Sequence, residues 1–228
     1  MDFKKQAAAK AVTLVKNGYV LGLGAGSTMA HAVSFLKEDI EKGLVLKLVT
    51  SSFDTKQLLQ QNGITVHEVK DFEQIDLYLD GCDQFDKNLN ALKSGGGIHT
   101  HEKLLAAMAR EFILVGEESK YAEKLDTKFP LAVELLPEAL GFIFSRIHQL
   151  FQHVKTAVRI NEKKSAPVVT TNGNYLLDIW YPEWPELSEI NPLLKSIPGI
   201  IETSLFYGMA QKAIISGEKG TRIVGKEI

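Results

Sequence analysis

The chain has 228 residues, is 45% hydrophobic and 24% charged, and carries a formal net charge of −2. This composition is ordinary for a folded globular protein and supplies no basic surface for nucleic acid or for an anionic membrane. Its one cysteine, Cys82, cannot form an internal disulfide, and no apolar run reaches the roughly 18 residues of a membrane span. We therefore expect a cytoplasmic protein that binds neither nucleic acid nor a membrane.

Helical and extended patterns alternate along the first half of the chain. Segments rich in helix formers predict helices, and short apolar runs between turn residues predict strands. The expected helices span residues 2–18, 28–43, 51–63 and 100–112. The expected strands span residues 19–23, 44–50, 75–81 and 112–117. Such alternation predicts a parallel sheet that is covered by helices on both faces.

The order of elements changes after residue 130. The patterns predict a strand and a helix within 130–151, a strand at 156–161, a hairpin over 167–180, a helix at 186–199 and a strand at 200–206. This order is typical of a small α+β module of the split-βαβ type. Two short strands within 212–224 could return to the first sheet.

Together these patterns predict an α/β fold with two domains. We expect a Rossmann-like parallel-sheet domain that is formed by residues 1–129 and 206–228. A smaller α+β domain of the ferredoxin-like type, residues 130–205, is expected to be inserted into it and to take part in oligomer contacts.

The sequence GLGAGST, residues 22–28, joins an expected strand to an expected helix. Such a turn is a ready anion site, because backbone N–H groups and the helix dipole point at the ligand and glycine lets a phosphate come close. The hydroxyls of Ser27 and Thr28 can add donors. The spacing matches neither a Walker loop nor the dinucleotide motif G-x-G-x-x-G. Taken alone, the stretch fits equally a tight turn in which Ser27 caps the helix.

Charged residues gather around a second glycine-rich stretch. Asp80 ends an apolar strand, where α/β sheets place their ligand sites, and Asp83 follows it across a turn. Lys93 precedes the glycine-rich residues 94–97, and Glu102 lies at the start of the next helix. A carboxylate here could abstract a carbon-bound proton, while Lys93 and the N–H groups of residues 94–97 stabilise the developing oxyanion.

Each of these charged residues also has a plainer interpretation. Asp80 and Asp83 could form a turn, since Asp-Gly is common turn chemistry. Glu102 could favour a helix N-terminus through its charge alone, and Lys93 could be a solvated lysine. The joint presence of all four, downstream of a phosphate-type loop, favours the functional interpretation.

The same stretch holds side chains that could bind a metal ion, and it contains the one cysteine. Asp80 and Asp83 could hold a divalent cation, and His99 with His101 could ligate zinc. No third ligand stands at a recognisable spacing, so we expect no metal and interpret the histidines as solvated or capping residues. Cys82 has no sequence pattern of a nucleophile and is expected to fill a small space beside Asp80.

A series of ordered motifs resembles ribose-5-phosphate isomerases of the A type, nearly from one end of the chain to the other. GLGAGST is similar to the family's G-x-G-T-G-S-T loop, LDGCDQFD to its D-G-A-D-E stretch, and KSGGGIHTHEK to K-G-G-G-x-x-x-T-R-E-K. ILVGEESK resembles a strand that ends in D-x-S-K, and FPLAVELLP resembles F-P-L-P-V-E-V-x-P. TTNGNYLLD resembles T-D-N-G-N-x-I-L-D, and IPGIIETSLF resembles I-P-G-V-V-E-x-G-L-F.

The resemblance implies an enzyme that interconverts D-ribose 5-phosphate and D-ribulose 5-phosphate through an enediolate, in the non-oxidative pentose phosphate pathway and without a cofactor. It also implies a homodimer or a dimer of dimers. It places the proton-transferring base at Glu102, and it places aspartates that bind sugar hydroxyls and assist ring opening at Asp80 and Asp83, with Lys93 as a further catalytic residue. The implied substrate-binding residues are Lys4, Ala25, Gly26, Ser27, Thr28, Gly81, Cys82, Ser94, Gly95, Gly96 and Lys120.

Several positions around this site differ from the family motifs. The differing residues are Ala25 for threonine, Gln84 for glutamate, Ser94 for glycine, His101 for arginine and Glu117 for aspartate. The differences leave Glu102, Asp80 and Asp83 in place. Two alternatives stay open: a related phosphosugar isomerase or deaminase with a shifted substrate, and a non-catalytic phosphosugar-binding protein.

Overall fold

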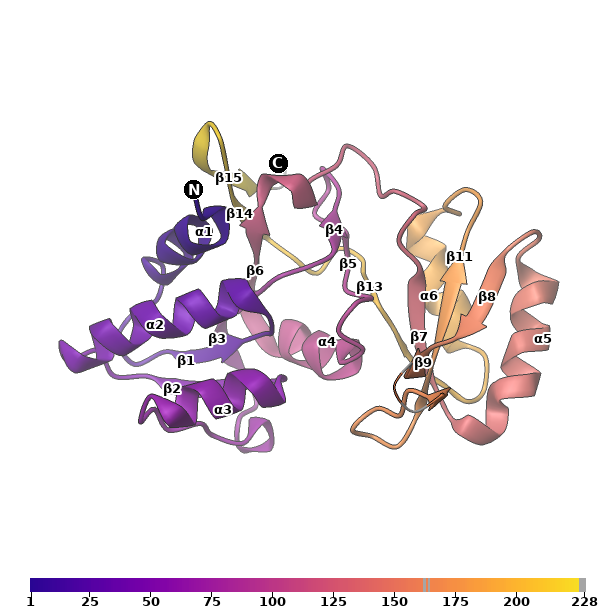
Figure 1. Cartoon of the computed structure of the whole chain (residues 1–228), viewed down its shortest axis with the longest axis horizontal. Helices are drawn as coiled ribbons and strands as arrows, with labels where there is room; N and C mark the ends of the chain where they lie inside the picture. Colours follow the sequence, from indigo (N-terminus) through magenta and orange to yellow (C-terminus); the bar gives the residue numbers. More distant parts are fainter. Residues whose placement is uncertain (162, 164, 226–228) are drawn as a thin grey trace.

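The computed structural model describes residues 1–161, 163 and 165–225, and it contains a larger and a smaller sheet on the two sides of the molecule (Figure 1). The larger sheet has six strands in the order β15-β14-β6-β3-β1-β2. All neighbouring pairs from β14 to β2 are parallel, and β15 pairs with β14 in antiparallel fashion. The strands are β1 Val20–Leu23, β2 Lys47–Thr50, β3 Ile75–Asp80, β6 Ala109–Glu117, β14 Lys212–Gly217 and β15 Gly220–Gly225.

Helices cover both faces of the larger sheet. They are α1 Phe3–Val12, α2 Ser27–Glu41, α3 Phe53–Gln61 and α4 His99–Met108. Leu77 and Leu79 of β3 pack into one hydrophobic cluster with α1 and α2, whereas Tyr78 between them packs into another cluster with Leu105 of α4. Successive side chains of a strand point to opposite faces, so both faces of the sheet are buried.

The smaller sheet has four antiparallel strands in the order β12-β7-β11-β8. Its elements are β7 Leu131–Leu135, α5 Leu140–Leu150, β8 Lys155–Val158, β11 Tyr175–Trp180, α6 Leu187–Lys195 and β12 Ile200–Thr203. Because β11 lies between β7 and β8, and α5 connects those two strands, this is the split-βαβ arrangement that the sequence predicts. The expected fold class is therefore confirmed. The exact domain boundaries stay a prediction, and residues 226–228 of the first expected domain lie outside the described residues.

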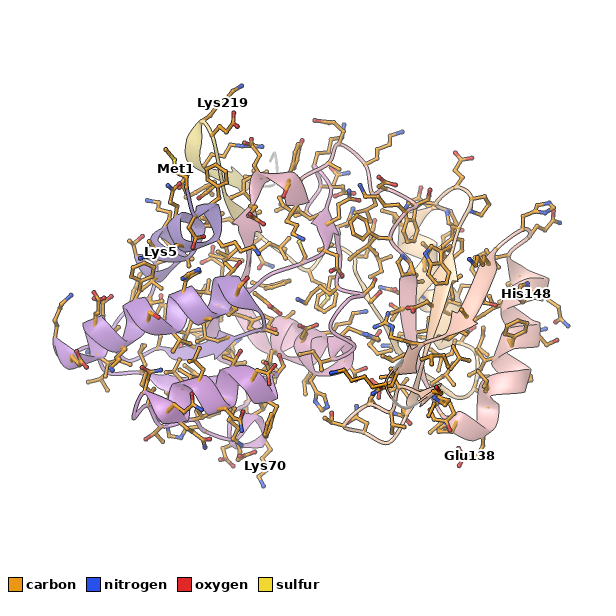
Figure 2. All side chains as sticks on the ribbon, in the orientation of Figure 1. Met1, Lys5, Lys70, Glu138, His148 and Lys219 are labelled. Atoms are coloured by element: carbon orange, nitrogen blue, oxygen red, sulfur yellow. The ribbon has the colours of Figure 1, made fainter. Side chains whose placement is uncertain are left out.

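Short elements connect the two sheets. Figure 1 shows α4, β4, β5 and β13 in the middle of the molecule, and side chains fill the space between the sheets (Figure 2). The short elements are β4 Gln84–Phe85, β5 Ala91–Leu92, β9 Ile160–Asn161, β10 Ala166–Pro167, β13 Leu205–Phe206 and the 3₁₀ turns η1 Val69–Asp71, η2 Glu118–Lys120 and η3 Pro137–Ala139. Within the described part of the chain, no helix has the length and apolar character that crossing a membrane would require.

The helix expected over residues 100–112 ends earlier, at Met108, and β6 begins at Ala109. The tertiary environment explains the difference. Phe112 stacks on Tyr78 with 5.1 Å between the ring centroids, and β6 pairs with β3 from Ala109 to Leu114. Burial of an aromatic residue in a sheet outweighs the local preference for a helix, which amounts to less than about 1 kcal/mol per residue.

The first helix and the expected hairpin also differ from the sequence prediction. The helix expected over 2–18 ends at Val12, where the Thr13 hydroxyl donates to a carbonyl of the last helical turn. The hairpin expected over 167–180 does turn at Asn172-Gly173, and Gly173 has φ +81°. However, β10 pairs with β9, and β11 pairs with β7 and β8. The hairpin therefore forms only next to its turn, where Val169 and Tyr175 make one antiparallel bridge, and the flanking residues pair with other strands.

Candidate active site

The carboxyl edge of the parallel sheet brings together the charged residues that the sequence singles out. Asp80 is the last residue of β3 and is 1% exposed. Lys93 follows β5 and Glu102 lies in the first turn of α4, and both side chains are buried. The Lys93 Nζ atom lies 2.8 Å from Asp80 Oδ2 and 3.2 Å from Glu102 Oε1. One buried cation therefore links two buried carboxyl groups.

One lysine cannot neutralise two carboxylates, so the cluster ionises unequally. Burial raises the pKa of Glu102, Lys93 lowers it and Asp80 raises it again, with the result that it stands at about 8. Burial alone would lower the pKa of Lys93, but the two carboxyl groups outweigh burial and raise it, so Lys93 remains a cation. A carboxyl group with a pKa near neutrality can both accept and return a proton at physiological pH.

Four hydrogen-bonding groups hold the Asp80 carboxylate in place. Its Oδ1 atom accepts from the backbone N–H groups of Ala25 at 3.1 Å and Gly81 at 2.7 Å. Its Oδ2 atom accepts from the Tyr78 hydroxyl at 2.6 Å, in addition to Lys93. Burial, with the nearby carboxylates, raises the pKa of Tyr78, so the hydroxyl keeps the proton that it donates. The Asp80 carboxylate is thus an oriented group rather than a free turn residue.

The second aspartate is held by the glycine-rich stretch after Lys93. Asp83 Oδ2 accepts from the backbone N–H groups of Ser94 at 2.6 Å and Gly95 at 2.8 Å. These two N–H groups were expected to face a developing oxyanion, and this expectation is wrong for them because Asp83 occupies them. The Ser94 hydroxyl is also turned away: it donates to the Pro130 carbonyl at 2.6 Å and lies 2.8 Å from the Ser204 hydroxyl.

The glycine loop leads directly into α2. Gly26 is the N-cap of this helix, with φ +90°, and no side chain caps the helix there. Ser27 is exposed and Thr28 is buried in the first turn. The Thr55 hydroxyl donates to the Gly24 carbonyl at 2.8 Å and so fixes the start of the loop. The N-terminus of a 15-residue helix, without a side-chain cap and next to exposed backbone, suits a bound anion.

Two predicted basic residues, Lys4 of α1 and Lys120, lie near the carboxyl end of β6. Lys4 Nζ is 3.8 Å from the carboxylate of Glu117, the last residue of β6. Lys120 ends the 3₁₀ turn that follows, and it lines a small enclosed space together with Cys82. Burial raises the pKa of Cys82 to about 12, so the thiol stays protonated and has the character of a packing residue.

Comparison with known proteins identifies the family. The family model described as ribose 5-phosphate isomerase A (phosphoriboisomerase A) matches residues 47–220. The chain belongs to this family. Among its relatives, the ribose-5-phosphate isomerase A of Synechococcus sp. is 34% identical over 98% of this chain and 97% of the relative. The ribose-5-phosphate isomerase of Homo sapiens is 36% identical over 96% of this chain and 72% of the relative.

Solved structures agree with the isomerase fold. The ribose 5-phosphate isomerase A of Methanocaldococcus jannaschii is 32% identical, with a TM-score of 0.91 over 98% of each chain. A D-ribose-5-phosphate isomerase in complex with phospho-erythronic acid is 31% identical, with a TM-score of 0.92 over 99% of this chain and all of that one. The family resemblance expected from the sequence motifs is therefore confirmed.

In this member of the isomerase A family, α4 is anchored to the smaller sheet by residues on either side of Glu102. The Lys103 Nζ atom lies 2.9 Å from Glu202 Oε1 and 2.5 Å from the Thr203 carbonyl. His99 is fully buried, with Nε2 3.2 Å from the Glu202 carbonyl, and burial lowers its pKa to about 4. The two histidines do not converge on a zinc site, and among the described residues no group of three metal-ligating side chains is found.

Glu134 of β7 is a structural residue whose role the sequence does not predict. This buried carboxylate accepts hydrogen bonds from four side chains, of Thr100, Thr170, Asn172 and Asn174. Burial alone would raise the pKa of Glu134, but these donors outweigh burial and lower it. Glu134 thus ties the turn of residues 170–174 to the start of α4. The motifs FPLAVELLP and TTNGNYLLD, which contain Glu134 and most of its partners, carried a signal for this network.

Proposed function

We propose that this chain interconverts D-ribose 5-phosphate and D-ribulose 5-phosphate through an enediolate. The observation that carries the proposal is the buried Asp80–Lys93–Glu102 cluster at the carboxyl edge of the sheet, next to the uncapped N-terminus of α2. Family membership supports the same activity. The reaction is redox-neutral overall, because it only moves hydrogen within one sugar, and so it requires no oxidant or reductant.

In the proposed mechanism Glu102 is the base that transfers the carbon-bound proton. It takes the proton from C2 of the open-chain aldose, the electron pair forms a C1–C2 double bond, and the carbonyl oxygen O1 becomes an oxyanion. Lys93 is the nearest cation to the base and would stabilise this oxyanion. A proton shift between O2 and O1 and return of the carbon-bound proton to C1 then give the ketose.

The remaining predicted residues are proposed to bind the substrate. Asp83 Oδ2 is held by backbone N–H groups, so its Oδ1 atom is proposed to accept from sugar hydroxyls during ring opening. Asp80 already accepts from four donors and is proposed to assist by holding Lys93 in place. The phosphate is placed at the α2 N-terminus, in reach of the hydroxyls of Ser27 and Thr28. Lys4 and Lys120 would add positive charge at the same edge of the sheet.

A substrate panel tests this function directly. Purified protein is assayed with ribose 5-phosphate, ribulose 5-phosphate, other pentose and hexose phosphates and an amino-sugar phosphate. We expect the same equilibrium mixture from either ribose 5-phosphate or ribulose 5-phosphate, and competitive inhibition by phospho-erythronic acid. Release of ammonia from the amino sugar in preference to pentose isomerisation would contradict the proposal, as would tight binding of pentose phosphates without turnover.

We also propose a homodimer that works in the cytoplasm, within the non-oxidative pentose phosphate pathway. Large apolar side chains at and near α5 support the dimer, because Leu136, Phe142 and Phe144 are 43%, 51% and 43% exposed. Light scattering at micromolar concentration is expected to give twice the mass of one chain. The double substitution Phe142→Glu and Phe144→Glu is expected to give monomers, and a wild-type monomer would refute the dimer.

A further inference from the structure

Arg159 reaches from the smaller sheet to the active-site loop. It follows β8, and its guanidinium forms a two-point ion pair with Asp178 of β11: Nε lies 3.0 Å from Oδ2, and Nη2 contacts Oδ1. The remaining terminal nitrogen, Nη1, donates to the Ser94 carbonyl at 2.7 Å, with the Gly95 carbonyl at 3.4 Å. The ion pair with Asp178 orients the planar guanidinium, so Nη1 is aimed at the loop.

The Ser94 carbonyl and the Gly95 N–H group belong to the same peptide unit. The carbonyl accepts from Arg159, and the N–H group donates to Asp83 Oδ2 at 2.8 Å. A cation at the oxygen end of a peptide polarises the unit and strengthens the hydrogen bond that its N–H group makes. Arg159 and Asp83 are therefore joined through one peptide bond, although they come from different sheets.

The glycines of the loop are what allow this arrangement. A Cβ atom on Gly95 would lie 2.9 Å from Asp83 Oδ1, so a side chain there would displace the carboxylate. Gly97 has φ +67°, and its Cβ atom would lie 2.7 Å from Leu176 Cδ1 and 3.6 Å from Arg159 Nη1. Gly95 is thus required because Asp83 packs against it, and Gly97 is required because Leu176 and Arg159 of the smaller domain pack against it.

We propose that Arg159 is a positioning residue of the active site, which holds Asp83 in its working orientation through the Ser94–Gly95 peptide. The proposal rests on the proposed function, in which Asp83 handles the sugar hydroxyls. It gives the smaller sheet a direct part in building the catalytic edge of the larger one. Arg159 itself touches no substrate in this scheme and acts only through the loop.

Single and double substitutions test the linkage. We expect Arg159→Ala to lower kcat/KM about 10²-fold, the size of effect that a misplacement near 1 Å produces. Arg159→Lys should recover only part of this loss, because an ammonium cannot bond both Asp178 oxygens and the Ser94 carbonyl in fixed geometry. Arg159→Ala in an Asp83→Asn background should cause less than about threefold further loss, because the two residues act as a unit. Arg110→Ala, which removes an exposed arginine that pairs with Asp76 of β3, is the matched control and should leave activity unchanged.

Chemical rescue separates positioning from simple destabilisation. Millimolar guanidinium chloride should restore part of the activity of Arg159→Ala, while equal concentrations of sodium chloride or urea should not. The proposal would be overturned if the two single losses in kcat/KM multiplied in the Arg159→Ala, Asp83→Asn double variant. It would also be overturned if Arg159→Ala kept kcat/KM within twofold of wild type. If the wild-type protein itself fails to isomerise ribose 5-phosphate, the proposed function fails; if only these variants behave otherwise than expected, the linkage alone fails.

Discussion

Replacement of Glu102 by glutamine is expected to lower kcat by 10²- to 10⁴-fold, the contribution that a positioned general base makes to a proton transfer. The amide keeps the shape of the side chain but cannot take a proton at neutral pH. Substrate affinity should stay near that of wild type, because the proposed phosphate and hydroxyl contacts lie on other residues. Steady-state kinetics in the direction of ribulose 5-phosphate formation measure both parameters.

The same substitution should leave the fold as stable as before or more stable. The pKa of Glu102 is about 8 in the folded protein and 4.5 in its ordinary state. Between these two values the folded chain binds a proton that the unfolded chain does not, so stability falls as the pH rises from 4.5 towards 8. Glutamine removes this penalty, because it carries no proton that the folded chain must hold. We therefore expect a Tm at or above the wild-type value.

The pH profile and isotope exchange complete the test of Glu102. Because the base must be ionised to act, kcat/KM of the wild type should rise with pH up to about 8, and this rise should be absent in Glu102→Gln. Asp80→Asn and Asp83→Asn are the controls for an alternative base. Deuterium from the solvent should enter C1 of the pentulose in the wild type. If Glu102→Gln exchanges that proton at the wild-type rate, the base lies elsewhere.

Helix caps and turns could be predicted from the sequence, because each depends on contacts between residues that are close together in the chain. Ser52 accepts from the Thr55 backbone N–H as the N-cap of α3, and the turn at Asn62-Gly63 ends that helix, as expected. The start of β6 could not be predicted in this way. The segment after Met108 carries good helix formers, and it becomes extended through its pairing with β3 and the stacking of Phe112 on Tyr78.

The candidate site likewise contains residues that the sequence predicts and contacts that only the structure reveals. Asp80, Lys93 and Glu102 could be selected from residue type and motif, and the structure places them in contact. The connection from Arg159 to Asp83 could not be found from sequence, because the two residues are far apart in the chain and meet across a loop of glycines. The sequence pattern shows that a loop requires glycines, but only the packing shows which neighbouring side chain excludes a Cβ atom there.

Gly24 of the GLGAGST loop is a glycine whose requirement only the packing explains. We expect Gly24→Ala to destabilise the fold and to abolish most of the activity. A Cβ atom on Gly24 would lie 1.8 Å from both Cγ and Oδ1 of Asp80. Neither side can yield easily, since the Gly24 N–H donates to the Leu79 carbonyl at 2.9 Å and Asp80 is held by its own donors. From the sequence these glycines are expected to face a phosphate, whereas the structure shows that Gly24 lacks room for a side chain because the Asp80 carboxylate packs against it.

We expect Gly24→Ala to lower the free energy of unfolding by about 3 kcal/mol or more, the upper part of the range for overpacked sites, and to shift Asp80 away from Lys93. Gly141→Ala is the matched control: its Cβ atom would meet nothing within 4 Å, and alanine should stabilise α5 slightly. Thermal denaturation and kcat are measured for both variants. Asp80→Ala removes the colliding atoms, so Gly24→Ala should cost much less stability in that background than in the wild type. An unchanged cost in the two backgrounds, or a Gly24→Ala protein with wild-type Tm and kcat, would show that the loop and the carboxylate are not in this contact.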